Sequence, residues 1–133
     1  MSLDEEIRKA IGTHGLWKSR LLSAIETGKS DFQPDHVCKD HLCEFGKWLY
    51  GPSLPATVKQ SPDYEACRKL HADFHQVAAD VLRYAVTGQK QKAIDAMGHR
   101  SRYADVSAQL TSAMSRWKAS AAHHAGVLSP AGA

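Results

Sequence analysis

The sequence predicts an all-α protein that folds as an antiparallel four-helix bundle, and three observations support this fold class. Four segments carry apolar residues at every third or fourth position, which is the period of an amphipathic helix, and none shows strand-like alternation. Glycine and proline gather mainly between these segments. At 133 residues, of which 43% are hydrophobic and 23% charged, the chain is long enough to bury one core without disulfides.

The first two helices are expected over 3–27 and 36–50. Ser2 is the expected N-cap of the first helix, followed by Glu5 in a capping box, and Gly28 is its expected stop. The second helix should end before the Gly-Pro pair at 51–52. Its apolar face is formed by Cys38, Leu42, Phe45 and Leu49.

The third helix is expected over 63–88, and the fourth segment over 89–122. The apolar residues of the fourth segment change phase near Gly98, which predicts a bend or a short break there. Short connections between four amphipathic helices favour a bundle with up-down topology. We therefore expect one domain at 1–122, followed by a flexible C-terminal tail at 123–133.

Charge and composition exclude several classes of protein. The 17 basic and 14 acidic residues are intermixed and form no basic stripe, so we expect no binding to nucleic acid. The N-terminus is acidic, and no apolar run approaches 18 residues, so we expect a cytoplasmic protein with no membrane insertion. Three cysteines are an odd number, which favours reduced thiols or metal ligation over a disulfide framework.

The informative residues are polar or sulfur-containing side chains on the apolar faces. His14 lies on the inner face of the first helix, Cys43 on the second, and His71 and His75 one turn apart on the third. Each alone has an ordinary explanation as a core residue. Together, three imidazoles and one thiolate form a four-ligand set that suits tetrahedral zinc. Because such a set leaves no position for an activated water, a structural or regulatory zinc site in the bundle core is favoured over catalysis.

The remaining cysteines and histidines are expected to lie outside the site. Cys67 precedes His71 and His75 by one and two turns, and three ligands in that row would span about 12 Å, too far for one ion. Cys67 is therefore expected in the core, and Cys38 is expected to be packed or partly exposed. The histidines expected to have no role in the site are His36, His41, His99, His123 and His124.

Three alternative functions remain open at this point. A diiron or haem-binding bundle would need bridging carboxylates or other iron ligands beside the histidines, and no glutamate is spaced suitably around His71 and His75. An enzyme would use Cys43 as a nucleophile with a histidine base. A purely structural zinc domain would use the same four ligands without any signal.

The sequence resembles the chemoreceptor zinc-binding domain family over about half of its length. The family's pattern consists of His-x-x-aromatic, Cys-x-apolar-Gly-x-aromatic and His-x-x-x-His, in that order. In this sequence the pattern is matched by His14 and Trp17, by Cys43, Phe45, Gly46 and Trp48, and by His71 and His75.

The resemblance implies a bacterial, cytosolic, dimeric helical domain that binds Zn²⁺ through His14, Cys43, His71 and His75. Such a domain regulates an output module, either a chemoreceptor or a diguanylate cyclase, in cis or in trans. The resemblance also implies that the zinc-bound cysteine senses oxidants such as hypochlorous acid. The side chains expected to keep the site dry are Trp17, Phe45, Trp48 and Phe74.

Overall fold

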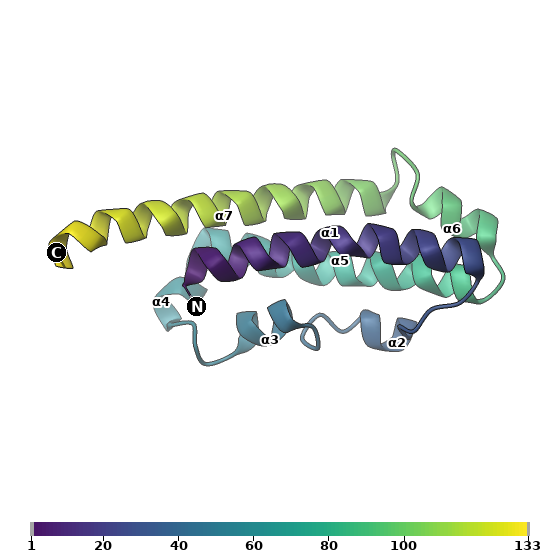
Figure 1. Cartoon of the computed structure of the whole chain (residues 1–133), viewed down its shortest axis with the longest axis horizontal. Coiled ribbons are helices and arrows are strands. Elements are labelled where there is room, and N and C mark those ends of the chain that lie inside the picture. Colours follow the sequence, from purple (N-terminus) through teal and green to yellow (C-terminus); the bar gives the residue numbers. More distant parts are fainter. Residues whose placement is uncertain (1, 133) are drawn as a thin grey trace.

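The computed structural model describes residues 2–132, with side chains described up to Ala121, and this part of the chain is helical with no strand. The all-α class is therefore confirmed. Three long helices dominate, and four short ones occupy the connections between them (Figure 1). The elements are α1 (Leu3–Thr27), α2 (Pro34–Val37), α3 (Glu44–Tyr50), α4 (Ala56–Lys59), α5 (Pro62–Val86), α6 (Lys90–Ala96) and α7 (Arg102–Gly132).

The three long helices pack against one another. In Figure 1, α1 and α5 run in the same direction, and α7 returns in the opposite direction. The segment that carries α2, α3 and α4 runs back along one side of these helices, and α2 packs against α5. The chain thus passes along the molecule four times, in alternating directions, but only three of the passes are long helices.

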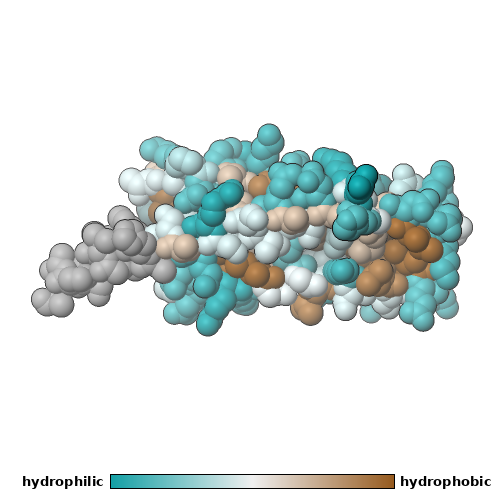
Figure 2. Space-filling view, turned by 90° about the horizontal axis from the view of Figure 1, so that it is seen from above, coloured by the Kyte–Doolittle hydropathy of each residue, from teal (hydrophilic) through white to brown (hydrophobic). Residues whose placement is uncertain are grey.

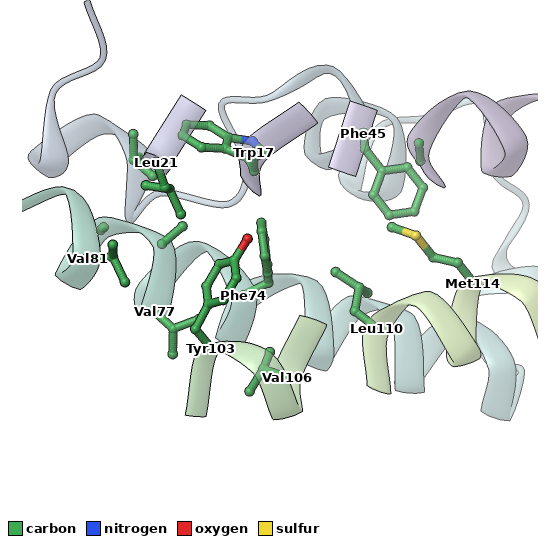
Figure 3. Close-up of a cluster of buried hydrophobic side chains, with 14 of the residues drawn as sticks. Trp17, Leu21, Phe45, Phe74, Val77, Val81, Tyr103, Val106, Leu110 and Met114 are labelled. Carbon is green, nitrogen blue, oxygen red and sulfur yellow. The ribbon is translucent and has the colours of Figure 1, made fainter. Parts of the chain in front are cut away.

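The core lies between the long helices and extends to the segment with α3. Figure 3 shows side chains of α1, α5 and α7 pointing toward one another, with Phe45 of α3 approaching from the side. The largest fully buried side chains include Phe74, Leu21 and Leu110, one from each long helix. These elements are therefore held together mainly by apolar burial, at about 25 cal/mol per Å² removed from water.

The prediction of one helix over 36–50 is wrong, because residues 38–43 leave the helical path between α2 and α3. The carbonyls that a continuous helix would use are taken by side chains of α5. His75 Nδ1 donates to the Val37 carbonyl at 2.7 Å, and Gln76 Nε2 donates to the Cys38 carbonyl at 3.2 Å. Leu42, expected on the inner face, is consequently 40% exposed. A regular four-helix bundle is therefore not confirmed.

Most of the expected boundaries agree with the structure. Gly28 ends α1 in the left-handed conformation, at φ 73°, and the break expected near Gly98 separates α6 from α7. Ser2 is the N-cap of α1, but its hydroxyl makes no capping bond, so the expected capping box is not formed. The tail expected at 123–133 lies beyond the described side chains, and Ala133 lies outside the described residues.

Within residues 2–132, none of the helices is both long enough and apolar enough to cross a membrane.

Candidate metal centre

Three potential metal ligands meet beside α5. His71 and His75 are each 4% exposed, and Cys43 is the N-cap residue of α3. The Nε2 atoms of the two histidines are 3.1 Å apart, and Cys43 Sγ is 3.3 Å from His71 Nε2. One donor atom from each of the three residues lies within 4.8 Å of the others. The structure thus brings together three of the four ligands predicted from the sequence.

The spacing and chemistry of these donors fit zinc. With Zn–N near 2.0–2.1 Å and Zn–S near 2.3 Å, tetrahedral coordination places two nitrogens roughly 3.3 Å apart and a nitrogen and a sulfur roughly 3.6 Å apart. The observed separations of 3.1 Å and 3.3 Å are only slightly shorter. A thiolate with imidazoles favours zinc over the hard cations that prefer oxygen ligands. The same donor set does not suit a diiron site, whose two iron ions need bridging carboxylates.

Both histidines of α5 are held in the neutral form that a metal ligand requires. Burial is the main cause: it lowers the pKa of His71 to about 3 and also lowers the pKa of His75. Because the Val37 carbonyl can only accept a hydrogen bond, the proton of His75 lies on Nδ1. The lone pair of His75 is therefore on Nε2, the nitrogen that faces the other two donors.

Cys43 is held by the turn that starts α3. The Gly46 N–H donates to Cys43 Sγ at 3.3 Å, and the thiol donates to the Asp40 carbonyl at 3.6 Å. Burial raises the pKa of the Cys43 thiol, so the metal-free protein keeps it protonated at neutral pH. Gly46 is required here, because a Cβ at this position would lie 1.7 Å from the Asp40 carbonyl oxygen. The close approach at Gly46 is thus made by the preceding loop and not by another helix.

His14 lies beside the three donors but does not join them. Its Nε2 is 3.2 Å from Ser107 Oγ on α7, and its ring centroid is 4.1 Å from that of Phe74. Burial lowers the pKa of His14 to about 4, so this imidazole is also neutral. A cavity of about 510 Å³ is lined by His14 and by all three donors, so the four side chains share one space. His14 remains the predicted fourth ligand.

Aromatic side chains surround the donors, as expected. Phe45 meets His71 edge-on with ring centroids 5.1 Å apart, and Trp17 and Phe74 lie 6.4 Å and 6.1 Å from His75. Trp48 stacks on Phe45 with ring centroids 5.6 Å apart. These rings lower the local polarity, which strengthens the interaction of any bound cation with its ligands.

The other cysteines and histidines that the structure describes are where the sequence predicted them. Cys67 is fully buried, and burial raises its pKa to about 12. Cys38 is half-buried. The histidines with exposed side chains are His36, His41 and His99, whereas His123 and His124 lie beyond the described side chains.

Two residues beside the site, Asp40 and Tyr50, were not predicted from the sequence. Asp40 Oδ2 lies 3.9 Å from His71 Nδ1, and the Tyr50 hydroxyl donates to the same carboxylate oxygen at 2.6 Å. Neither residue belongs to an apolar face or to the ligand pattern, so helical periodicity gives no sign of them. The only available signal was the position of Asp40, three residues before Cys43.

These features define a helical protein with a buried, soft-donor metal centre. The chemoreceptor zinc-binding domain family matches residues 14–82, over half of the chain and all four predicted ligands. The chain belongs to this family, which makes it a zinc-binding sensory domain. A comparison with curated proteins gives no match, and a comparison with solved structures gives none either.

Proposed function

We propose that this chain binds one zinc ion and regulates a signalling output. The signal is either the presence of bound zinc or the oxidation of Cys43. The observation that carries the proposal is the convergence of Cys43, His71 and His75 within 4.8 Å. His14, which lines the same cavity, completes the ligand set by turning toward these donors. The two histidines come from one helix, whereas Cys43 is the ligand that fastens the separate segment carrying α3.

Cys43 is proposed as the switch. Bound zinc would keep its sulfur as a thiolate, which is the form that oxidants attack. Hypochlorous acid transfers its oxygen to this thiolate: the sulfur loses two electrons and becomes a sulfenic acid, and the chlorine gains them and leaves as chloride. The cavity of about 510 Å³ beside Cys43 offers a route for so small an oxidant.

Loss of the sulfur ligand would remove one attachment of the segment around α3. The segment is otherwise held by the buried side chains of Val37, Phe45 and Leu49. Three hydrogen bonds from α5 add to this: the Tyr64 hydroxyl donates to the Leu49 carbonyl at 2.8 Å, and His75 and Gln76 donate to the carbonyls of Val37 and Cys38. Because packed helices shift as units, loosening of this segment would reach a chemoreceptor or a diguanylate cyclase module, in cis or in trans, through α1 and α5.

A homodimer is proposed as the signalling form. Leu16 and Leu22 on α1 are 53% and 49% exposed, and Ile94 on the adjoining α6 is 44% exposed. Figure 2 shows, on the face seen from above, that apolar side chains gather at the end of the molecule where α6 lies. Light scattering on the wild type and on Leu16→Glu tests this: the wild type should give twice the chain mass of 14.6 kDa, and the variant should give the single mass.

The test of the switch uses the Cys38→Ala, Cys67→Ala double variant, in which Cys43 is the only thiol. Hypochlorous acid is added to the zinc-loaded protein, and zinc release, helix content and the mass of the Cys43 peptide are followed together. Zinc release in step with Cys43 oxidation supports the switch.

If zinc stays bound while the wild type is oxidised at Cys38 or Cys67, the redox switch is wrong and a zinc sensor or structural zinc domain is left. If the purified protein takes up no zinc at all, the proposed function itself is wrong.

A further inference from the structure

One atom of the metal centre is buried without a partner. His71 Nδ1 is the single buried side-chain nitrogen or oxygen, among the described side chains, that makes no hydrogen bond. Leaving such an atom unsatisfied destabilises the folded protein, because the atom loses its hydrogen bond to water and gains none in return. The nearest charged group is the Asp40 carboxylate, whose Oδ2 lies 3.9 Å away, too far for a hydrogen bond.

The Asp40 carboxylate is held in place from the other side. The Tyr50 hydroxyl donates to its Oδ2 at 2.6 Å, and the Asp40 side chain is only 19% exposed. Burial, together with this hydrogen bond to Asp40, raises the pKa of Tyr50 to about 12. The tyrosine therefore remains a donor throughout the neutral range, and the carboxylate is fixed where it faces the His71 ring.

The proton position on His71 explains the orphaned nitrogen. The Nε2 of His75 carries a lone pair, since its Nδ1 donates to Val37. In the metal-free protein, His71 carries its proton on Nε2 and donates it to this lone pair, 3.1 Å away. The Nδ1 of His71 is then a bare acceptor that faces the Asp40 carboxylate, another acceptor. Neither can donate to the other.

Metal binding reverses this arrangement. A cation at His71 Nε2 needs the lone pair of that nitrogen, so the ring proton moves to Nδ1 and points at Asp40. We propose that Asp40, held by Tyr50, is the positioning residue of the metal centre and accepts the Nδ1–H of His71 only when a divalent cation occupies Nε2. This inference rests on the proposed zinc binding. Carboxylate partners of this kind orient a ligating histidine and increase its basicity.

The test compares zinc affinity in wild type, Asp40→Asn, Tyr50→Phe and a charge-matched control, Asp35→Asn, measured by competition with a chromogenic chelator. Asp35 belongs to the same pass of the chain and is 94% exposed. Asp40→Asn should bind zinc about 10–100-fold more weakly. Tyr50→Phe should weaken binding less, in the same direction, and Asp35→Asn should match the wild type.

Two further measurements separate positioning from a merely structural role. An asparagine at position 40 can donate to the bare Nδ1 of His71, so the metal-free Asp40→Asn variant should be at least as stable to urea as the metal-free wild type. In zinc-loaded wild type, the imidazole ¹⁵N–¹H spectrum should show His71 protonated on Nδ1, with a strongly downfield proton that Asp40→Asn moves upfield.

The outcomes are distinct. Wild type that binds no zinc overturns the proposed function. Wild type that binds zinc, with equal affinity in Asp40→Asn, overturns only the role of Asp40. If Asp40→Asn fails to fold, Tyr50→Phe decides: weaker binding than in Asp35→Asn, with unchanged helix content, supports the role, and equal binding overturns it.

Discussion

His71 and His75 face each other across one turn of α5, with their Nε2 atoms 3.1 Å apart. Two buried imidazoles at this distance are compatible either with one shared proton or with a cation between their lone pairs and that of Cys43. Burial keeps both rings uncharged, which removes the repulsion that two imidazolium groups would otherwise exert. The metal-free protein thus already holds both rings in the charge state that a cation requires. The proton of His71 only has to move to Nδ1, and the only proton that must leave the site is that of the thiol.

Zinc binding should release about one proton per ion at pH 7. The histidines are already neutral, whereas burial raises the pKa of Cys43, so its thiol proton must be displaced. Titration calorimetry in buffers of different ionisation enthalpy measures this number. The Cys43→Ala variant, if it still binds, should release close to none. Release near zero from the wild type would mean that Cys43 is not a ligand.

The ligand set predicts opposite results at His14 and Cys67. Replacing His14 with alanine should weaken zinc binding by tenfold or more, because it removes a fourth donor. Cys67→Ala should leave binding unchanged, since this thiol is in the core and its pKa is about 12. The cobalt-substituted protein provides a check, because loss of His14 should also alter the ligand-field spectrum. Normal zinc affinity in His14→Ala would exclude His14 from the site.

The metal-free protein should lose stability on acidification below about pH 6.5. In the unfolded chain the histidines titrate near 6.5, whereas burial lowers the pKa of folded His14 to about 4 and of folded His71 to about 3. Between these values the unfolded state binds more protons, so stability falls as the pH falls. Urea unfolding with a chelator present, at pH 7.5, 6 and 5, measures the effect.

Two variants control for this pH dependence. His71→Gln should flatten the profile, because its side chain does not titrate. His36→Gln, which removes a histidine whose side chain is exposed, is the matched control for this variant. A wild-type protein equally stable at pH 7.5 and pH 5 would contradict the burial of neutral histidines.

Gly46→Ala should damage both stability and zinc binding. The new Cβ would lie 1.7 Å from the Asp40 carbonyl oxygen and 2.9 Å from the Cα of His41, so the loop before Cys43 would have to move. We expect a loss of about 1–3 kcal/mol and weaker zinc binding. Gly15→Ala is the matched control, because nothing lies within 4 Å of its new Cβ. It should stabilise α1 by about 0.5–1 kcal/mol and leave zinc binding unchanged. Equal behaviour of the two variants would contradict the close approach at Gly46.

The sequence by itself determined the long helices and the type of metal ligand in the site. The apolar period of α1 and α5 and the left-handed Gly28 are local properties, and so is the i, i+4 spacing of His71 and His75. Each depends on residues within a turn or two of the chain. The burial of Cys67 followed from the same periodicity.

Only the tertiary structure decided the shape of residues 38–43 and the surroundings of the metal centre. The local pattern there fits a helix, but His75 and Gln76 of α5 take the carbonyls of Val37 and Cys38 that the helix would need. The contact of Asp40 with His71 joins residues far apart in the chain, and so does that of His14 with Ser107. Contacts between residues so far apart in the chain depend on how the helices pack, and a local sequence pattern does not contain that information.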